Sequence, residues 1–257
     1  MFRVSIITVC FNSAATIRDT IESVLKQAYT EIEYIIVDGG STDNTMKIIK
    51  EYGEKITKVI SEPDQGIYDA MNKGIRASTG RAICTLNSDD MYSDSTAVER
   101  LVKTMESANS DTVFADLVYV NPLNTDRITR YYDSSRFQPK RLAYGWMPAH
   151  PTFMVKRDLY DKWGGYSLNY RIAADYEMVV RLLHKAAASY AYLPEVVVKM
   201  RTGGISTRGL SSSWILNNEI VRACQENGLD TNLPRVLMKI PEKLLERFVI
   251  PKTKVRS

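Results

Sequence analysis

The stretch Cys84-Thr85-Leu86-Asn87-Ser88-Asp89-Asp90 joins an apolar segment to two adjacent carboxylates. Its first residues are typical of a buried strand, which places Asp89 and Asp90 at the carboxyl end of that strand. Carboxylates this close repel each other and raise each other's pKa unless a cation or hydrogen-bond donors lie between them. Mg²⁺ and Mn²⁺ prefer such oxygen ligands, with water and substrate phosphates completing the shell. The stretch favours a divalent-metal site, and the alternative is a polar turn that caps a helix beginning near Ser95.

The first hundred residues alternate β-rich segments with amphipathic helices. Strands are expected over residues 4–9, 34–37, 57–60 and 82–86, and helices begin near Ile17, Thr42 and Ile67, with Thr42 as a candidate N-cap. This alternation predicts an α/β fold with a mostly parallel central sheet, right-handed crossovers and flanking helices. Ligands of such sheets bind beyond the carboxyl ends of the strands. The segment 9–11, Asp38 and the pair Asp89-Asp90 all fall at that edge.

The alternation weakens beyond Leu101. Further strands are expected over residues 112–115, 126–132 and 195–201, helices over 175–185 and 213–227, and loops over 137–150 and 202–209. We expect one catalytic domain over residues 1–228 and a basic amphipathic helical tail over residues 229–257.

Composition excludes several classes of protein. The chain has 257 residues, 44% of them hydrophobic and 25% charged, which suits a single α/β domain. Its three cysteines, Cys10, Cys84 and Cys224, show neither CxxC spacing nor an even count, so we expect no disulfide framework or zinc site. No apolar run reaches the roughly 18 residues of a membrane span, and residues 4–11 are too short for a signal sequence, so we expect a cytoplasmic protein.

The tail carries the positive charge. Residues 233–257 hold seven Lys or Arg and two Asp or Glu, a net charge of +5, whereas the whole chain has +4. The body is therefore nearly neutral, and we expect no nucleic-acid partner. Apolar residues recur at helical spacing among the cations: Leu233, Val236, Leu237, Ile240, Leu244, Leu245, Phe248 and Val249. Pro241 would kink this helix.

Two surfaces suit such a tail. One is a membrane with anionic lipid, where the apolar face enters the headgroup boundary and Arg235, Lys239, Lys243 and Arg247 meet the lipid charge. The other is the catalytic body, or a second subunit in a homo-oligomer. The net charge favours the membrane, because packing on protein does not require it.

The loop after the first expected strand excludes two classes of nucleotide-binding enzyme. Phe11-Asn12-Ser13-Ala14-Ala15-Thr16 matches neither the G-x-G-x-x-G motif of dinucleotide enzymes nor the P-loop. What remains at the sheet edge is Phe11 as a stacking surface for a base, Asp38 as an acceptor for base N–H groups, and the pair Asp89-Asp90 for a metal. This set suits a nucleoside diphosphate linked to another group.

Five stretches together resemble the inverting glycosyltransferases of family 2, which have the GT-A fold. They run in the family's order across residues 4–205 and comprise Ser5–Asn12, Ile36–Asp43, Ser61–Gly74, Leu86–Asp90 and Ala174–Glu177. The resemblance is closest to bacterial enzymes that build surface polysaccharides or lipid-linked oligosaccharides.

The resemblance implies roles for particular residues. It assigns the nucleotide pocket to Val9, Phe11, Asp38, Asp64 and Asp89, with Phe11 and Asp38 at the base and Asp89 near the ribose and the metal. It also makes Asp90 the main metal ligand, for Mn²⁺ or Mg²⁺, and Asp175 the catalytic base. His150 would lie near the donor phosphates, and Arg201 with Ser206 would belong to a loop that closes over the donor.

The chain departs from the family pattern at two positions. Asn87 stands where many members have the first aspartate of D-x-D, which leaves the metal fewer carboxylates. Ala174 replaces a frequent glutamate before the base. Structural alternatives also exist, with Phe11 as a core aromatic, Asp38 as a turn, Asp175 as a helix N-cap, His150 as a structural histidine and Arg201 in a plain loop.

The implied reaction is a single displacement in which an acceptor hydroxyl attacks the anomeric carbon of a nucleotide-sugar and inverts it. The acceptor would be a saccharide or a polyprenyl-diphosphate-linked sugar, which would hold the enzyme at the inner face of the cell membrane. A glycosidase would need a second carboxylate across the sugar. Two alternatives stay open, namely a sugar nucleotidyltransferase, which should have a Gly- and Arg-rich loop at residues 12–14, and a non-catalytic member that binds nucleotide or glycan.

Overall fold

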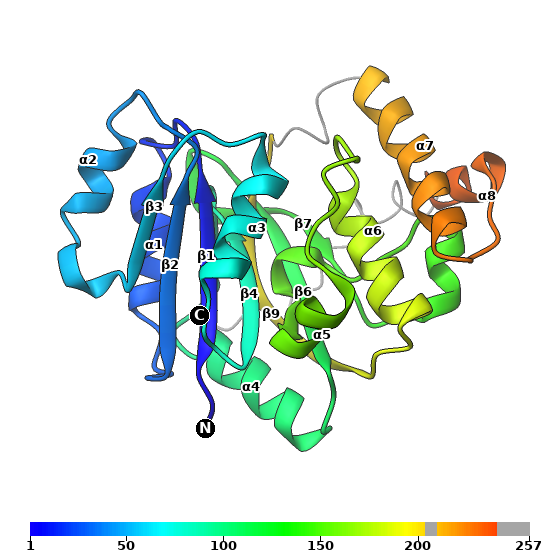
Figure 1. Cartoon of the computed structure of the whole chain (residues 1–257), viewed down its shortest axis with the longest axis horizontal. Helices are drawn as coiled ribbons and strands as arrows, with labels where there is room; N and C mark the ends of the chain where they lie inside the picture. The colour runs from blue at the N-terminus through cyan, green and yellow to red at the C-terminus, as the bar shows by residue number, and fades with distance from the viewer. Residues whose placement is uncertain (204–209, 241–257) are drawn as a thin grey trace.

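A nine-stranded mixed sheet forms the centre of the molecule (Figure 1). The computed structural model describes residues 1–203 and 210–240. The first part of the sheet is parallel, as predicted, in the order β3-β2-β1-β4. These strands are β1 (Val4–Cys10), β2 (Ile32–Asp38), β3 (Lys58–Ser61) and β4 (Ala82–Asn87).

The second part of the sheet mixes directions. Strand β8 is antiparallel to both β4 and β6. Strand β6 is parallel to β9 and antiparallel to β7. Strand β5 is antiparallel to β9. These strands are β5 (Asp90–Tyr92), β6 (Thr112–Asn121), β7 (Asn124–Tyr132), β8 (Met154–Lys156) and β9 (Tyr190–Arg201). The three-residue strands β5 and β8 were not expected, because so short a segment shows no periodicity.

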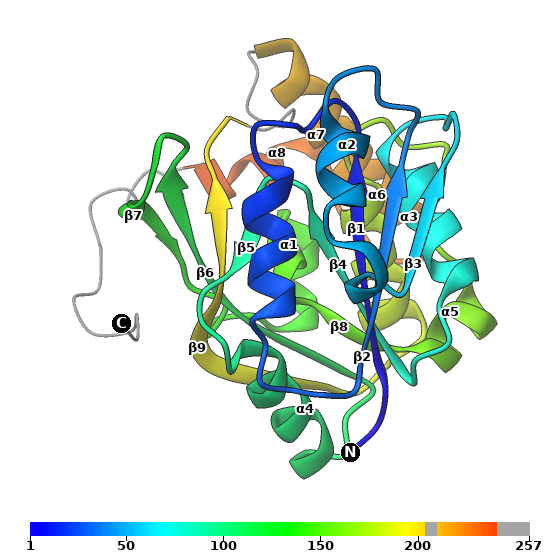
Figure 2. The same cartoon turned by 90° about the vertical axis from the view of Figure 1, so that its left-hand side faces the viewer.

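Helices cover both faces of the sheet (Figure 2). One face carries α1 (Ile17–Leu25), α2 (Thr45–Lys50) and α4 (Ala97–Ser107). The other carries α3 (Ile67–Ala77), α5 (Arg157–Trp163), α6 (Ala174–Val180) and α7 (Leu210–Glu226), followed by α8 (Leu233–Leu237). All seven residues of β1 are buried, which explains why its mostly apolar sequence shows no alternation, since a parallel strand in the middle of the sheet is covered on both faces.

Local boundaries differ from the predicted ones in two helices. Helix α2 begins at Thr45 after Asn44, so the prediction of Thr42 as its N-cap is wrong. The backbone amide of Thr42 instead donates to the side chain of Asn12. The helix expected over 175–185 ends at Val180 and continues as one π turn. Short 3₁₀ turns lie at Gly53–Lys55, Pro139–Tyr144 and His150–Thr152.

The described part of the tail packs on the body. Helix α8 contacts α7 and the 3₁₀ turn Pro139–Tyr144, and the side chain of Val236 is completely buried. Leu237, Met238 and Ile240 are exposed instead. The remaining predicted tail residues, Leu244, Leu245, Phe248 and Val249 with Lys243 and Arg247, lie outside the described residues. Within residues 1–203 and 210–240 no helix is both long and apolar enough to cross a bilayer.

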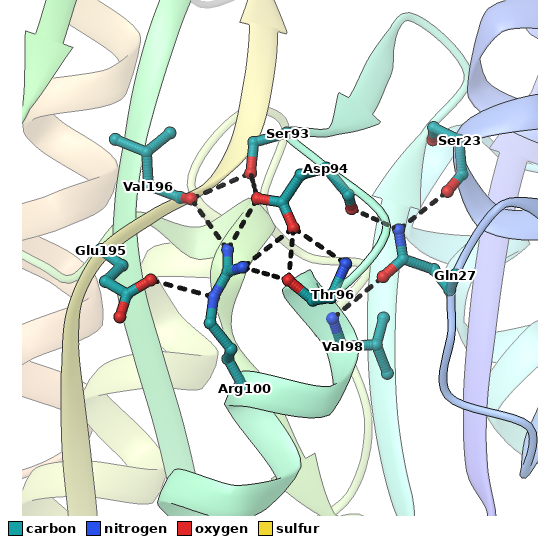
Figure 3. Close-up of polar contacts among 9 residues, drawn as sticks. All are labelled: Ser23, Gln27, Ser93, Asp94, Thr96, Val98, Arg100, Glu195 and Val196. Atoms are coloured by element: carbon teal, nitrogen blue, oxygen red, sulfur yellow. Dashed lines mark hydrogen bonds and ion pairs between the residues drawn. The ribbon is translucent and has the colours of Figure 1, made fainter. Parts of the chain in front are cut away.

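A polar network fixes the chain just after Asp89-Asp90 (Figure 3). The carboxylate of Asp94 accepts hydrogen bonds from the Arg100 guanidinium at 2.8 and 2.9 Å and from the backbone amide of Thr96 at 2.8 Å. Arg100 also pairs with Glu195 of β9 at 3.0 Å. Gln27 of the segment after α1 donates to the carbonyl of Asp94 at 2.7 Å. The network joins the start of α4 to α1 and β9.

We expect Asp94→Ala to lower the free energy of unfolding at pH 7 by about 3 kcal/mol, because it leaves the Arg100 guanidinium buried without its main partner. Although burial raises the pKa of Asp94, the hydrogen bonds from Arg100 and Thr96 hold it well below the usual value. The stabilisation is therefore complete above the ordinary aspartate pKa and is lost as the pH falls through the depressed one. Urea unfolding measures both effects, and Glu51→Ala, which breaks an exposed ion pair, is the control. An equal loss in the two variants would contradict the prediction.

Candidate functional site

The predicted nucleotide-pocket residues of β1 and β2 meet at the carboxyl edge of the sheet. Val9 is buried and pairs in register with Val37 of β2 and Asn87 of β4, and Cys10 pairs with Asp38. Phe11 follows directly and is 61% exposed, which excludes the alternative of a core aromatic. An exposed aromatic side chain at this edge provides a flat surface for a base.

Asn12 joins the loop after β1 to the loop after β2. Its backbone is left-handed, with φ of 47°, a conformation that asparagine tolerates better than most residues. Its side-chain oxygen accepts the backbone amides of Thr42 and Asp43 at 2.9 and 3.3 Å. The hydroxyl of Ser13 lies 2.8 Å from that of Ser88, so the same loop also reaches the turn after β4. Neither Asn12 nor Asp43 was predicted as a site residue, although each is the last residue of a stretch that resembles the family.

Asp38 is completely buried and holds the turn that follows it. Its carboxylate accepts the backbone amides of Gly40 and Ser41 at 3.2 and 3.1 Å, and the hydroxyl of Ser61 at 2.7 Å. The structure thus supports the turn-forming role of Asp38. Burial, followed by the charge of Asp38, raises the pKa of the neighbouring Cys10 thiol, which stays protonated.

Asp64 lies against the same turn. A Cβ on Gly39 would come within 2.3 Å of its Oδ2 atom, so only glycine at position 39 allows this close approach. Its other oxygen accepts the backbone amide of Gly66 at 2.8 Å, just before α3. The tertiary structure therefore places Asp64 against the turn that follows Asp38, although Asp64 lies 26 positions further along the sequence.

The turn after β4 holds Asp89 and Asp90 at different depths. Asp90 is completely buried as the first residue of β5, and Asp89 is half-buried. Burial, and then the charge of Asp89, raises the pKa of Asp90 well above its usual value. Burial likewise raises the pKa of Asp89. The Oδ1 atoms of Asp90 and Asn87 are buried, and among the described residues neither has a hydrogen-bond partner.

These oxygens fit a hard divalent cation. Carboxylates with raised pKa values and unpartnered buried oxygens are groups that a cation would stabilise. Within residues 1–203 and 210–240 no three His, Cys, Asp or Glu side chains gather as a complete metal cage. The protein would supply only part of the shell. Because Asp89 is the more exposed of the two carboxylates, we expect a cation that enters from the surface to meet Asp89 first.

Arg201 holds this turn through the backbone carbonyl of Asp89. Its guanidinium is buried and donates to the carbonyl of Asp89 at 2.9 Å, and it also forms an ion pair with Asp19 of α1. In the structure Arg201 therefore contacts the turn of the candidate metal site. Its predicted companion in a closing loop, Ser206, lies outside the described residues.

A cavity of about 150 Å³ contains Asp175 and His150. The Nδ1 atom of His150 lies 3.3 Å from Oδ2 of Asp175, and Oδ1 of Asp175 accepts the backbone amide of Tyr176 at 2.8 Å. Asp175 follows the first residue of α6, and the N-cap position belongs to Ala173, so Asp175 is not the N-cap. The rest of the wall is largely apolar and includes Leu117, Tyr132, Met147, Met200, Leu216 and Ile220.

Lys239 was predicted as a tail residue that faces lipid, but it lines this cavity and is only 6% exposed. A Cβ on Gly145 would lie 2.8 Å from its Nζ atom, so the glycine leaves room for the ammonium group. Sequence periodicity gave no sign of this placement, because it depends on how α8 packs.

Glu177 is the other carboxylate near Asp175 in the sequence. It is buried, pairs with Arg181 at 2.9 Å and accepts the side-chain amide of Asn227 at 3.1 Å. Arg181 also donates to the carbonyls of Gly164 and Gly165. These contacts make Glu177 part of the packing of α6, and Asp175 is the carboxylate of this helix that faces the cavity.

Residues 5–164 match Glycosyl transferase family 2. The chain belongs to this family. It is 28% identical over 254 residues to a PGL/p-HBAD biosynthesis glycosyltransferase of Mycobacterium bovis, covering 97% of this chain and 94% of the relative. It is also 38% identical over 106 residues, or 40% of this chain and 42% of the relative, to a putative teichuronic acid biosynthesis glycosyltransferase, TuaG, of Bacillus subtilis.

Solved structures show the same fold at low sequence identity. TarS of S. aureus, residues 1–349 in complex with UDP-GlcNAc, superposes with a TM-score of 0.66 at 18% identity, over 96% of this chain and 72% of that one. The present chain spans 44% of the longer TarS structure. The mannosyltransferase PcManGT of Pyrobaculum calidifontis, with GDP-Man and Mn²⁺, gives 0.60 at 16% identity, over 95% of this chain and 80% of that one. The chain is therefore a glycosyltransferase with the GT-A fold.

Proposed function

We propose that this glycosyltransferase moves a sugar from a nucleoside diphosphate donor to a hydroxyl of a saccharide or polyprenyl-diphosphate-linked acceptor, with inversion at the anomeric carbon. The observation that carries the proposal is the placement of Asp175 beside His150 in a largely apolar cavity. The family membership and the nucleotide-sugars bound by TarS and PcManGT support it.

The donor would lie along the carboxyl edge of β1, β2 and β4. Phe11 offers the stacking surface, and Val9, Asp38 and Asp64 form the wall behind the nucleotide. Asp89 is half-buried at the end of this wall, where the ribose and diphosphate would lie. Arg201, which fixes the carbonyl of Asp89, would act on the donor by holding this turn in place.

Asp175 would take the proton of the attacking acceptor hydroxyl. A base needs a carboxylate within hydrogen-bond reach of that proton, and the cavity provides one. When the proton of neutral His150 is on Nδ1, the imidazole can donate to Oδ2 of Asp175 and orient it, leaving the other lone pairs for the acceptor. The apolar wall of the cavity would exclude water and so favour transfer over hydrolysis.

Mn²⁺ or Mg²⁺ would be held by Asp89 and Asp90, with Asn87 as a neutral oxygen ligand beside them. When bound, such a cation acts as a Lewis acid that offsets the negative charge developing on the leaving diphosphate. The unpartnered oxygens of Asp90 and Asn87 support this assignment, as does the Mn²⁺ in PcManGT.

Two other functions were open from the sequence. A sugar nucleotidyltransferase would share the metal and the fold, but the family membership and the names of the relatives favour sugar transfer. A non-catalytic member that only binds nucleotide or glycan would leave Asp175 without a role, and turnover with any donor would exclude it.

The experiment that tests the proposal screens UDP-, GDP- and dTDP-sugars with Mn²⁺ or Mg²⁺ for thermal stabilisation, because a ligand that binds the native state raises its stability by mass action. Donors that stabilise the protein are then tested for nucleoside diphosphate release with saccharide and lipid-linked acceptors. Absence of stabilisation by every nucleotide-sugar would contradict the proposal.

We also propose that the tail holds the enzyme at the inner face of the cell membrane. The exposed Leu237, Met238 and Ile240 follow the buried Val236, and the basic segment 241–257 comes after them. We expect sedimentation with vesicles that contain anionic lipid at low salt and release at high salt. Replacing both Lys243 and Arg247 by Glu should weaken this binding.

The matched control for the tail variant replaces Lys47 and Lys50 by Glu, since both are exposed cations on α2, far along the chain from the tail. Equal vesicle binding by the two double variants would mean that the tail has no special part in membrane association. Analytical ultracentrifugation of the same samples shows whether the enzyme forms a homo-oligomer.

A further inference from the structure

A carboxylate from a distant helix holds the loop that leads into Asp175. Oε1 of Glu219 accepts the backbone amide of Arg171 at 2.7 Å, and Oε2 accepts those of Ile172 and Ala173, both at 2.9 Å. Three consecutive amides thus converge on one side chain of α7. Hydrogen bonds from amides to a carboxylate are charge-assisted and stronger than neutral ones.

Tyr68 of α3 holds the same loop through a backbone carbonyl. Its hydroxyl donates to the carbonyl of Ile172, and its ring stacks on Tyr166 with centroids 5.8 Å apart. Burial, and then the charge of Asp175, raises the pKa of Tyr68, so the phenol keeps its proton and remains a donor. Residues 171–173 are therefore held by side chains of two helices, Glu219 of α7 and Tyr68 of α3.

The start of α6 has no side-chain cap of its own, so the loop before it depends on hydrogen bonds from other helices. The N-cap residue, Ala173, has no side chain that could accept a hydrogen bond, and α6 has only seven residues. Ala174 likewise contributes no polar group. Without Glu219 the three amides before the helix would lose their acceptors, and among the contacts described here only Tyr68 would still hold the loop before Asp175.

We propose that Glu219 is a positioning residue for Asp175, acting through the three amides of residues 171–173. The inference rests on the proposed function, in which Asp175 is the base. Its consequence is a loss of turnover without a loss of donor binding, because the hydrogen bonds of Glu219 go to residues 171–173 and not to β1, β2 or β4. Displacement of a reacting group by about 1 Å can lower a rate by about 100-fold.

The experiment compares Glu219→Ala and Glu219→Asp with Glu226→Gln in the full-length enzyme. Glu226 is on the same helix but accepts from the side chain of Tyr170, not from the loop backbone. Hydrogen exchange of peptides that cover residues 170–176 needs no substrate and tests the clamp itself. We expect faster exchange at 171–173 in Glu219→Ala, a smaller increase in Glu219→Asp, and no change at these amides in Glu226→Gln.

Kinetics then test the consequence, with UDP-GlcNAc or the donor that stabilises the enzyme most. We expect kcat to fall by about 10- to 100-fold in Glu219→Ala, with partial recovery in Glu219→Asp and a donor KM within twofold of the unsubstituted enzyme. Unchanged exchange at 171–173 overturns the clamp. Faster exchange with unchanged kcat overturns the positioning role, provided that Asp175→Asn has lost activity. If Asp175→Asn is fully active, the base assignment is what fails.

Discussion

Replacing Asp175 by Asn is expected to lower sugar transfer by roughly two to four orders of magnitude, which is the usual contribution of a general base. The substitution keeps the size of the side chain and the acceptor for the Tyr176 amide, so fold and donor affinity should persist. Initial rates of nucleoside diphosphate release with acceptor present measure the effect, and melting temperatures with and without donor check binding.

The control for this variant is Asp161→Asn, the same change at an exposed position on α5. It should leave the rate within twofold of the unsubstituted enzyme. A fully active Asp175→Asn enzyme would remove Asp175 from the mechanism. Glu177 would not be its replacement, because its carboxylate is buried against Arg181 and Asn227.

Replacing Asp89 by Asn, or Asp90 by Ala, is expected to remove the stabilisation that Mn²⁺ gives in the presence of UDP or GDP. With Mn²⁺ present, a nucleotide at 100 times its Kd should stabilise the unsubstituted enzyme by about 2.7 kcal/mol relative to the ligand-free protein. The Mn²⁺-dependent gain is the part of this stabilisation that is lost when the metal is left out. Asp89 is half-buried at the surface of the turn, and Asp90 lies behind it with one unpartnered oxygen. Each change leaves a cation with fewer charged ligands.

Thermal melts with and without MnCl₂ measure the gain, and Asp126→Asn, at a carboxylate whose side chain is 95% exposed, is the control. Comparing Asp89→Asn with Asp90→Ala shows which of the two carboxylates binds the cation. If Asp89→Asn removes the gain and Asp90→Ala only lowers the basal melting temperature, Asp89 is the ligand and Asp90 supports the turn. Full Mn²⁺-dependent stabilisation in both variants would reject the metal site.

The local sequence was sufficient to predict the parallel half of the sheet. Strands β1, β2 and β4 have enough apolar residues to be recognised, and the motif residues at their carboxyl ends must lie at one edge because parallel strands end together. Phe11, Asp38 and Asp89-Asp90 were placed there correctly for this reason. The motifs also predicted the family, since they report residue types that this chemistry requires.

Only the tertiary structure decided the contacts around these motifs. Arg201 meets Asp89 from 112 positions away in the sequence, and Glu219, in the middle of α7, meets the amides of 171–173. Lys239, which helical spacing assigned to a lipid-facing tail, lies in the cavity of Asp175. A periodic pattern states which face of a helix is apolar, but it does not state what that face meets. Those partners depend on how the whole chain packs, which no local stretch of sequence encodes.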